Sequence, residues 1–302
     1  MTTADASAFE SYRPLMFSIA YRMLGSATEA EDIVQEAYLR YQAVAPGAIQ
    51  SPKAFLSTVV TRLCLNQLQS ARVQRETYIG PWLPEPIFTE TDERANPRHQ
   101  AEMHDSISFA FLVLLEELTP LERAVFLLRE VFDYEYDEIA VILDKEPAAC
   151  RQVFSRAKKH VTDARPRFTP APEAHRQLLS QFLQATSAGD LDGLTALLAA
   201  DVVMWADGGG KARGAALHPL HGPQAVAQFL AGTRRFMQEG SQAELAAING
   251  ELAIILRASG KAYVVLSITA GEGAVREIRV VGNPDKLNWV NLPKAPTGEA
   301  AE

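Results

Sequence analysis

Cysteine is scarce in this 302-residue sequence, which contains only Cys64 and Cys150. A small secreted domain stapled by disulfides carries an even set of cysteines at short spacings, so two distant thiols favour a reducing cytoplasm. No apolar run approaches the roughly 18 residues of a membrane-spanning helix, and residues 1–10 lack the basic and apolar segments of an export signal. We therefore expect a cytoplasmic protein with no membrane partner.

Positive charge is also in short supply, because the formal net charge is −8. This balance excludes a protein that coats nucleic acid by bulk charge, although a reader with one basic face remains compatible with it. Residues 145–167 depart from the average, with seven basic residues against two acidic ones. The sequence therefore predicts a focused anion-binding surface in this segment.

Hydrophobic spacing and proline-rich breaks divide the chain into three expected domains. The segments 1–76 and 104–165 carry apolar residues at helical spacing, so each is expected to be an all-α domain. Residues 173–295 begin with helices and continue with β-rich runs, which predicts an α+β domain. Proline-rich linkers are expected at 77–103 and 166–172, and a flexible tail at 296–302.

Two helix starts carry recognisable capping residues. Thr28 and Glu31 fit the spacing of a capping box, in which each side chain accepts from the other residue's backbone N–H. Ser51 and Pro52 combine a hydroxyl cap with proline in the first helical turn. We expect a helix to begin at each of these points.

The segment 134–161 has the pattern of a helix-turn-helix: a short helix at 136–143, a break at 144–146 and a basic second helix. On the second helix Cys150, Val153, Ala157 and Val161 can face a core. Arginine and glutamine have the geometry that matches guanine and adenine edges in the major groove. The alternative is a basic surface helix in an ordinary bundle. The candidate DNA-reading residues are Arg151, Gln152, Ser155, Arg156 and Lys158.

Two other polar faces are weaker signals. An acidic face formed by Asp32, Gln35 and Glu36 suits a basic partner helix, although a solvated helix face is the commoner outcome for such a run. On the helix after Pro52, a second polar face can hold a phosphate backbone and reach unstacked bases. Its residues are Arg62, Asn66, Gln69 and Arg72.

The order of these motifs resembles the extracytoplasmic-function sigma factors. The resemblance rests on Asp-Ile-Val-Gln-Glu-Ala at 32–37, Pro-Lys-Ala-Phe-Leu at 52–56, and Leu-Thr-Pro-Leu-Glu-Arg-Ala-Val-Phe-Leu-Leu at 118–128 before the helix-turn-helix. It implies that the acidic face docks on the clamp helices of the polymerase β′ subunit, with the β flap as a second contact. It also implies that the polar face at 62–72 meets the −10 promoter element and that the basic helix reads the −35 element. Where this family usually has glycine at the turn, the chain has Asp144, which tolerates positive φ.

The C-terminal third resembles the SnoaL-like branch of the NTF2-like folds, in which a curved sheet and helices form a cone-shaped pocket. The similarity rests on residues 189–194 and 197–203. Three further segments resemble those of a sigma-factor group that carries such a domain. They suggest that the apolar linker segment docks on this domain and regulates promoter engagement. The residues are Trp82, Leu83, Pro84, Glu85 and Pro86; Asp207, Gly208, Gly209, Gly210 and Lys211; and Asn283, Pro284, Asp285, Lys286 and Leu287.

An enzyme or a small-molecule sensor with an appended DNA-binding module is the alternative function. Its candidate groups are Asp207, His218, His221, Tyr263 and Asp285, but the sequence cannot show that they converge on a substrate. His218 and His221 have no third metal ligand nearby in the sequence. We therefore expect no catalytic residue, no metal and no cofactor, and we leave open a small ligand in the pocket. The expected partners are core RNA polymerase and promoter DNA.

Overall fold

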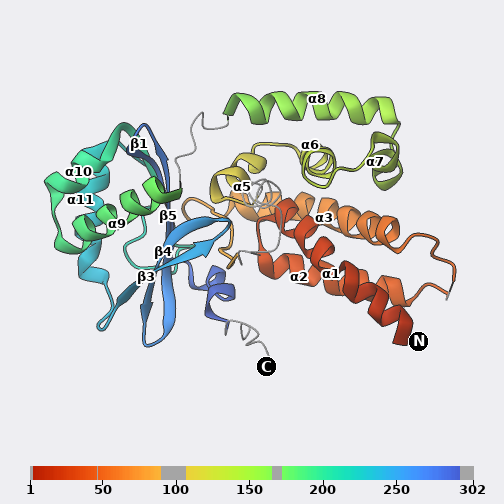
Figure 1. Ribbon diagram of the computed structural model, residues 1–302, viewed down its shortest axis with the longest axis horizontal. Coiled ribbons are helices and arrows are strands. Elements are labelled where there is room, and N and C mark those ends of the chain that lie inside the picture. The colour runs from red at the N-terminus through yellow and green to blue at the C-terminus, as the bar shows by residue number, and fades with distance from the viewer. Residues whose placement is uncertain (1–2, 46, 90–106, 165–171, 293–302) are drawn as a thin grey trace. The chain divides into compact units, whose positions relative to one another are not determined.

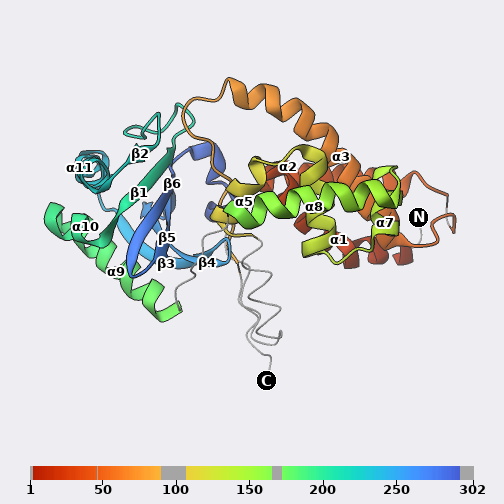
Figure 2. The ribbon, with the colours of Figure 1, turned by 90° about the horizontal axis from the view of Figure 1, so that it is seen from above.

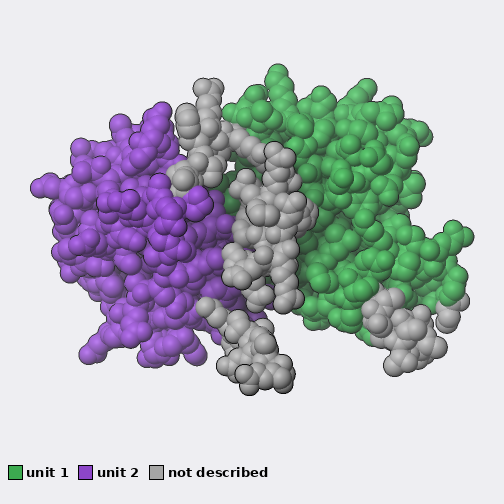
Figure 3. All heavy atoms as spheres, viewed as in Figure 1, with its two compact units in different colours: residues 1–78, 91–167 green, residues 79–90, 168–302 purple. Residues whose placement is uncertain are grey.

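The computed structural model describes residues 3–45, 47–89, 107–164 and 172–292 (Figure 1). The chain forms two compact units (Figure 3). The N-terminal unit contains residues 1–78 and 91–167, and the C-terminal unit contains residues 79–90 and 168–302. Most of the expected linkers and the whole expected tail fall outside the described residues. Among the described helices, none is long and apolar enough to cross a membrane.

The first half of the N-terminal unit is a helical bundle in which α1 packs against both α2 and α3. Its helices are α1 (Thr3–Leu24), α2 (Ala27–Gln42) and α3 (Pro52–Glu76). The expected cap of α3 is confirmed, because the Ser51 hydroxyl accepts from Ala54 N at 3.3 Å. The capping box expected at Thr28 is wrong. Ser26 caps α2 instead and accepts from Glu29 N at 3.1 Å, because the helix begins one residue before Thr28.

The second half of the N-terminal unit contains the expected helix-turn-helix. Its elements are α5 (Phe109–Glu116), α6 (Pro120–Phe126), the π-helical turn η1 (Leu127–Val131), α7 (Tyr136–Leu143) and α8 (Pro147–Ala164). A capping box of Thr119 and Glu122 starts α6, and the hydrogen bond from the Thr119 hydroxyl is the main cause that lowers the pKa of Glu122. Asp144 ends α7 in the left-handed conformation, with φ of 53°, as expected for this turn.

The C-terminal unit is an α+β domain with a single six-stranded sheet in the order β2-β1-β6-β5-β4-β3. The β1 and β6 strands are parallel, and the other neighbours are antiparallel. Figure 2 shows α9, α10 and α11 on one side of this sheet. Its elements are α9 (Pro172–Ala188), α10 (Leu191–Leu197), β1 (Leu198–Asp207), β2 (Leu220–His221), α11 (Pro223–Thr233), η2 (Arg234–Phe236), β3 (Gln242–Ile248), β4 (Glu251–Ala258), β5 (Lys261–Gly271), β6 (Ala274–Val281), η3 (Pro284–Lys286) and η4 (Trp289–Asn291).

A buried core fills the space between the helices and the sheet. Phe182 of α9 and Val226 of α11 contribute to it from the helices, and Met204, Ile254 and Ile278 from the strands. The sequence pattern does not predict β3, because glutamine, glutamate and alanine have little strand preference. Its pairing with β4 along the whole strand supplies the hydrogen bonds that hold it extended.

Candidate functional sites

The helix α8 has one buried and one exposed face. Cys150 and Ala157 are at most 1% exposed, and Val153 and Val161 are also buried. The five candidate DNA-reading residues are all exposed on the other face. The helix period therefore places every polar candidate in solvent while the apolar positions hold α8 on the domain.

Two of these exposed cations are held by neighbours in the same unit. The Arg151 guanidinium lies 5.5 Å from the centre of the Tyr136 ring, and Lys158 Nζ lies 3.0 Å from a carboxylate oxygen of Glu130. The Lys158 pair is exposed and contributes little stability. Both side chains can therefore exchange these partners for an anion at small cost.

The acidic face on α2 is also accessible. Asp32 and Gln35 are exposed, and Glu36 is half-buried and accepts a hydrogen bond from Arg40 Nε at 2.8 Å. Leu39, four residues after Gln35, is 60% exposed. An apolar side chain beside acidic ones is the pattern of a surface that packs against an amphipathic basic helix.

The polar face on α3 is only partly free. Asn66 and Gln69 are exposed on α3. Arg72 belongs to the same helix, but its side chain falls outside the described residues. Arg62 donates from Nε to the Ile142 carbonyl at 2.9 Å, and from its NH2 group to the Val141 carbonyl at 3.3 Å. These carbonyls end α7, where the helix dipole favours a cation.

Other contacts join the same two halves of the N-terminal unit. The Ser57 and Tyr134 hydroxyls lie 2.6 Å apart. The Arg123 guanidinium donates to the Met23 carbonyl and to a Glu116 carboxylate oxygen, each at 2.7 Å. Burial lowers the pKa of Arg123 to about 10, so it stays charged at neutral pH. The helix-turn-helix and the first three helices are thus hydrogen-bonded to each other in this structure.

The three segments singled out for the linker and the C-terminal domain meet in one place. The Asp207 carboxylate accepts from Leu83 N at 2.8 Å and from Lys286 Nζ at 2.7 Å. Lys286 Nζ also donates to the Leu83 carbonyl at 2.5 Å and lies 4.1 Å from the centre of the Trp82 ring. Both backbone polar groups of Leu83 are therefore held by one buried ion pair. We call this arrangement the Leu83 clamp, made of Leu83, Asp207 and Lys286.

Gly210 makes room for the linker, and Gly208 makes room within its own loop. An added Cβ at Gly210, whose φ is +71°, would lie 2.9 Å from the Ile79 side chain. An added Cβ at Gly208 would lie 2.5 Å from the Ala215 side chain. At the edge of the clamp, Lys211 and Asp285 form an exposed ion pair that links the other two segments.

The linker has a second anchor that the sequence did not predict, and we call it the Asn249 anchor. Ile87 N donates to the Asn249 side-chain oxygen at 3.0 Å, and Asn249 N donates back to the Ile87 carbonyl at 3.0 Å. Phe88 forms an isolated antiparallel bridge with Ile248, and Thr89 N donates to the Ala247 carbonyl at 3.1 Å. The only sequence signal is the Asn-Gly pair at 249–250, which marks a hairpin turn and says nothing about docking.

Of the five groups weighed for catalysis, Asp207 and Tyr263 line the same cavity, whereas His218, His221 and Asp285 do not. Asp207 is committed to the Leu83 clamp, and Asp285 pairs with Lys211 on the surface. The Tyr263 hydroxyl lies 2.8 Å from the Ser241 hydroxyl, whereas His218 and His221 are exposed. Among the described residues, no cluster of three or more histidine, cysteine or acidic side chains could hold a metal.

Comparison with known proteins gives the family. The sequence matches the models for sigma-70 region 2 over residues 8–73 and for sigma-70 region 4 over residues 108–161. It is 36% identical over 307 residues to the ECF RNA polymerase sigma factor SigJ of Mycobacterium tuberculosis, and 97% of each chain is covered. This chain belongs to the extracytoplasmic-function RNA polymerase sigma factors. The probable sigma factor SigI of the same species is 33% identical over 198 residues, which cover 64% of this chain and 66% of SigI.

The fold of this sigma factor agrees with that of a solved relative. The crystal structure of M. tuberculosis SigJ aligns with a TM-score of 0.72 at 36% identity and covers 94% of this chain and 98% of that chain. An NTF2-like protein from Burkholderia xenovorans aligns over 36% of this chain with a TM-score of 0.28. The expected class is confirmed in its architecture, because two helical sigma domains are followed by an α+β domain. As a sigma factor, the chain has core RNA polymerase and promoter DNA as partners.

Proposed function

We propose that this sigma factor binds the β′ clamp of core polymerase through the acidic face of α2, with the β flap as a second contact. The exposed face of α8 then reads the −35 element, and the polar face of α3 meets the −10 element. The observation that carries this proposal is the exposure of all five candidates on α8 above a wholly apolar buried face. The protein acts in the cytoplasm, where its polymerase works, and its C-terminal unit performs no catalysis.

We further propose that the free factor is closed. Arg62, a candidate for the −10 element, instead donates to the carbonyls that end α7 of the helix-turn-helix. DNA phosphates and these carbonyls compete for the same guanidinium. Core polymerase therefore has to separate the two helical halves before both promoter elements are read. The acidic net charge supports binding of core polymerase before promoter DNA, because the free chain has little affinity for DNA by charge alone.

The C-terminal unit regulates promoter engagement by holding the linker. The Leu83 clamp and the Asn249 anchor fix residues 83–89, which lie in the sequence between the two promoter-reading regions. A held linker limits the distance that these regions can span. The NTF2-like domain thus does in the same chain what a separate regulatory protein would otherwise do.

Two charge reversals test the polymerase and promoter contacts. Asp32→Arg should abolish core binding in a pull-down assay, and Asp192→Arg, an exposed acidic residue of α10, serves as the matched control. Arg151→Glu should leave core binding intact and weaken transcription from promoters with the cognate −35 element. Lys159→Glu on the same helix should weaken all promoters alike. The reverse pattern, in which Arg151→Glu loses core binding, would refute the assignments.

Removal of residues 171–302, which carry the partners of the linker segment, tests regulation. Transcription from a set of promoters is compared between this truncation and the full chain. A rise in output assigns a restraining role to the clamp, and a fall assigns a contact required for initiation. Unchanged output together with unchanged promoter choice would overturn the proposal.

A further inference from the structure

The C-terminal unit encloses a cavity of about 750 Å³ that the sigma-factor function does not use. This volume is typical of sites that hold small organic molecules. The interior wall is apolar and comes from both helices and strands. It includes Phe182 of α9, Phe229 of α11, and Ile254, Leu256 and Leu266 of the sheet.

The wall carries an excess of positive charge. Five basic residues line the cavity, Lys211, Arg213, Arg234, Arg235 and Lys261, and of these Lys211 is paired with Asp285 outside it. Its one acidic lining residue, Asp207, already holds Lys286 and Leu83 N. Within the described part of the chain, the Arg213 and Lys261 side chains form no hydrogen bond or ion pair. Cations without carboxylates beside an apolar cavity favour an anionic occupant.

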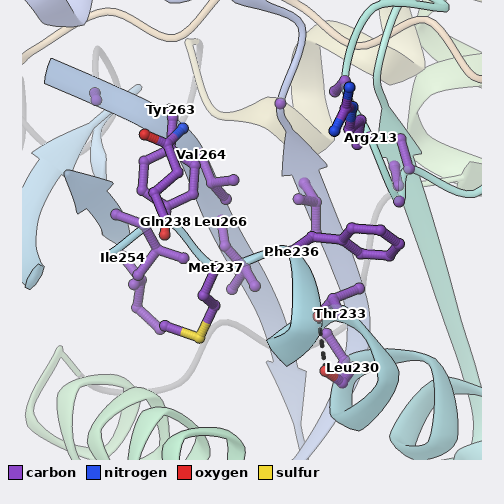
Figure 4. Close-up of a pocket in the computed structure, with 18 of the residues that line it drawn as sticks. Arg213, Leu230, Thr233, Phe236, Met237, Gln238, Ile254, Tyr263, Val264 and Leu266 are labelled. Atoms are coloured by element: carbon purple, nitrogen blue, oxygen red, sulfur yellow. Dashed lines mark hydrogen bonds between the residues drawn. The ribbon is translucent and has the colours of Figure 1, made fainter. Parts of the chain in front are cut away.

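Two segments form the cavity mouth. The residues at 211–215 and those at 234–238 both line it. Gly214 lies so close to the Phe236 ring that a Cβ added at Gly214 would be 2.4 Å from a ring carbon. Phe236 and Met237 are 40% and 45% exposed, although they are large apolar side chains. Figure 4 shows Arg213 on the same side of the cavity as the Phe236 ring, with Met237 near Ile254. The mouth therefore offers both apolar surface and an arginine.

We propose that this cavity binds an amphipathic organic anion. Its apolar body lies against the sheet and α11, and its carboxylate pairs with Arg213 at the mouth. Arginine suits this role because its guanidinium donates two parallel hydrogen bonds to one carboxylate. A neutral ligand of the same shape loses these bonds and gains only the apolar contact.

The test uses the full-length chain without polymerase, and decanoate as the probe. Calorimetry should detect decanoate binding, with 1-decanol binding about tenfold more weakly. Arg213→Gln should weaken decanoate by about tenfold and leave 1-decanol unchanged, whereas Arg276→Gln, an exposed arginine of β6 outside the cavity, should change neither. Equal binding of both molecules to the wild-type chain, or no binding of either, overturns the proposal.

A second variant locates the site. Thr233 lines the cavity at the end of α11 and is half-buried, so Thr233→Trp fills the space near the mouth without removing a core side chain. It should abolish binding of both molecules while circular dichroism shows a folded chain. Retained binding in this folded variant overturns the location.

The cavity borders the Leu83 clamp, because Asp207 of the clamp lines it. Lys211, Pro284 and Leu287, from the two segments that contain Asp207 and Lys286, line it as well. If the regulatory role proposed above holds, an occupied cavity stabilises the docked linker through these residues. Saturating decanoate should then slow proteolysis of residues 79–89. Binding without this protection refutes the coupling and leaves the site standing, and absence of binding leaves the sigma-factor assignment untouched.

Discussion

The Leu83 clamp makes a prediction about stability that can be worked from its burial. The Asp207 side chain is fully buried and that of Lys286 is 8% exposed. Lys286→Met removes the cation and leaves the Asp207 carboxylate buried. Of the two hydrogen bonds described above for this carboxylate, only the one from Leu83 N remains. Breaking a buried ion pair in this way costs about 3–5 kcal/mol, because an uncompensated charge stays out of water.

The chain contains a matched control for this variant. Lys211 and Asp285 belong to the same two segments, but their side chains are 56% and 62% exposed. Lys211→Met should therefore cost no more than about 1 kcal/mol, because solvent screens the pair. The double variant Asp207→Asn with Lys286→Met should be destabilised by about 1–3 kcal/mol less than the sum of the single changes.

Tryptophan fluorescence measures this effect in one unit alone. The three tryptophans, Trp82, Trp205 and Trp289, all belong to the C-terminal unit. Urea unfolding of the full chain, followed by this signal, therefore reports the free energy of unfolding of that unit. If Lys286→Met costs no more than Lys211→Met, or if the two single changes add without coupling, the clamp does not hold the linker as described.

Three further predictions concern other parts of the chain. Arg62→Gln removes hydrogen bonds to the end of α7 and should weaken the packing of α3 on α7 by about 1 kcal/mol, a value that allows for the exposure of the arginine. Amide hydrogen exchange in α7 should therefore become faster. If exchange in α7 is the same in Arg62→Gln as in the control variant Gln69→Ala, the closed state is contradicted. Burial raises the pKa of the Cys64 and Cys150 thiols, so the folded chain should resist iodoacetamide at pH 8 until denaturant is added, and rapid labelling would show that they are accessible. Burial lowers the pKa of His175, so protonation favours the unfolded state and the C-terminal unit should lose stability as the pH falls below about 6.5. His175→Leu should reduce this loss in urea unfolding between pH 7.5 and pH 5.5, and an identical pH dependence in both proteins would contradict the reasoning.

Local patterns in the sequence were sufficient to predict which face of a helix is buried and where a helix begins. The helix period of α8 correctly separates Cys150 and Val153 from Arg151 and Ser155, because a helix that packs on one side must expose the other. The hydroxyl cap expected at Ser51 also forms, because its side chain and the Ala54 N–H lie three residues apart in the first turn. The same logic failed at Thr28, since Ser26 offers an equivalent hydroxyl two residues earlier and the two choices differ by little energy.

Contacts between distant segments were beyond the reach of such patterns. Nothing in the sequence near Arg62 indicates that its guanidinium binds carbonyls 79 and 80 residues away. Asn249 looks like an ordinary hairpin residue, yet it pairs with Ile87 across 162 residues. The β3 strand has weak strand preference and forms because β4 supplies its hydrogen bonds.

The sequence by itself determined the family, the order of the domains and the faces of the helices, because these depend on motifs and on spacing along the chain. It also indicated that the apolar linker segment at 82–86 docks on the C-terminal domain. Only the tertiary structure decided that Asp207 and Lys286 hold Leu83 from both sides. The same is true of the cationic cavity, which is assembled from helices, strands and loops. A buried ion pair or a pocket requires several segments to converge, and the free energy of that convergence is set by packing in three dimensions rather than by any local pattern.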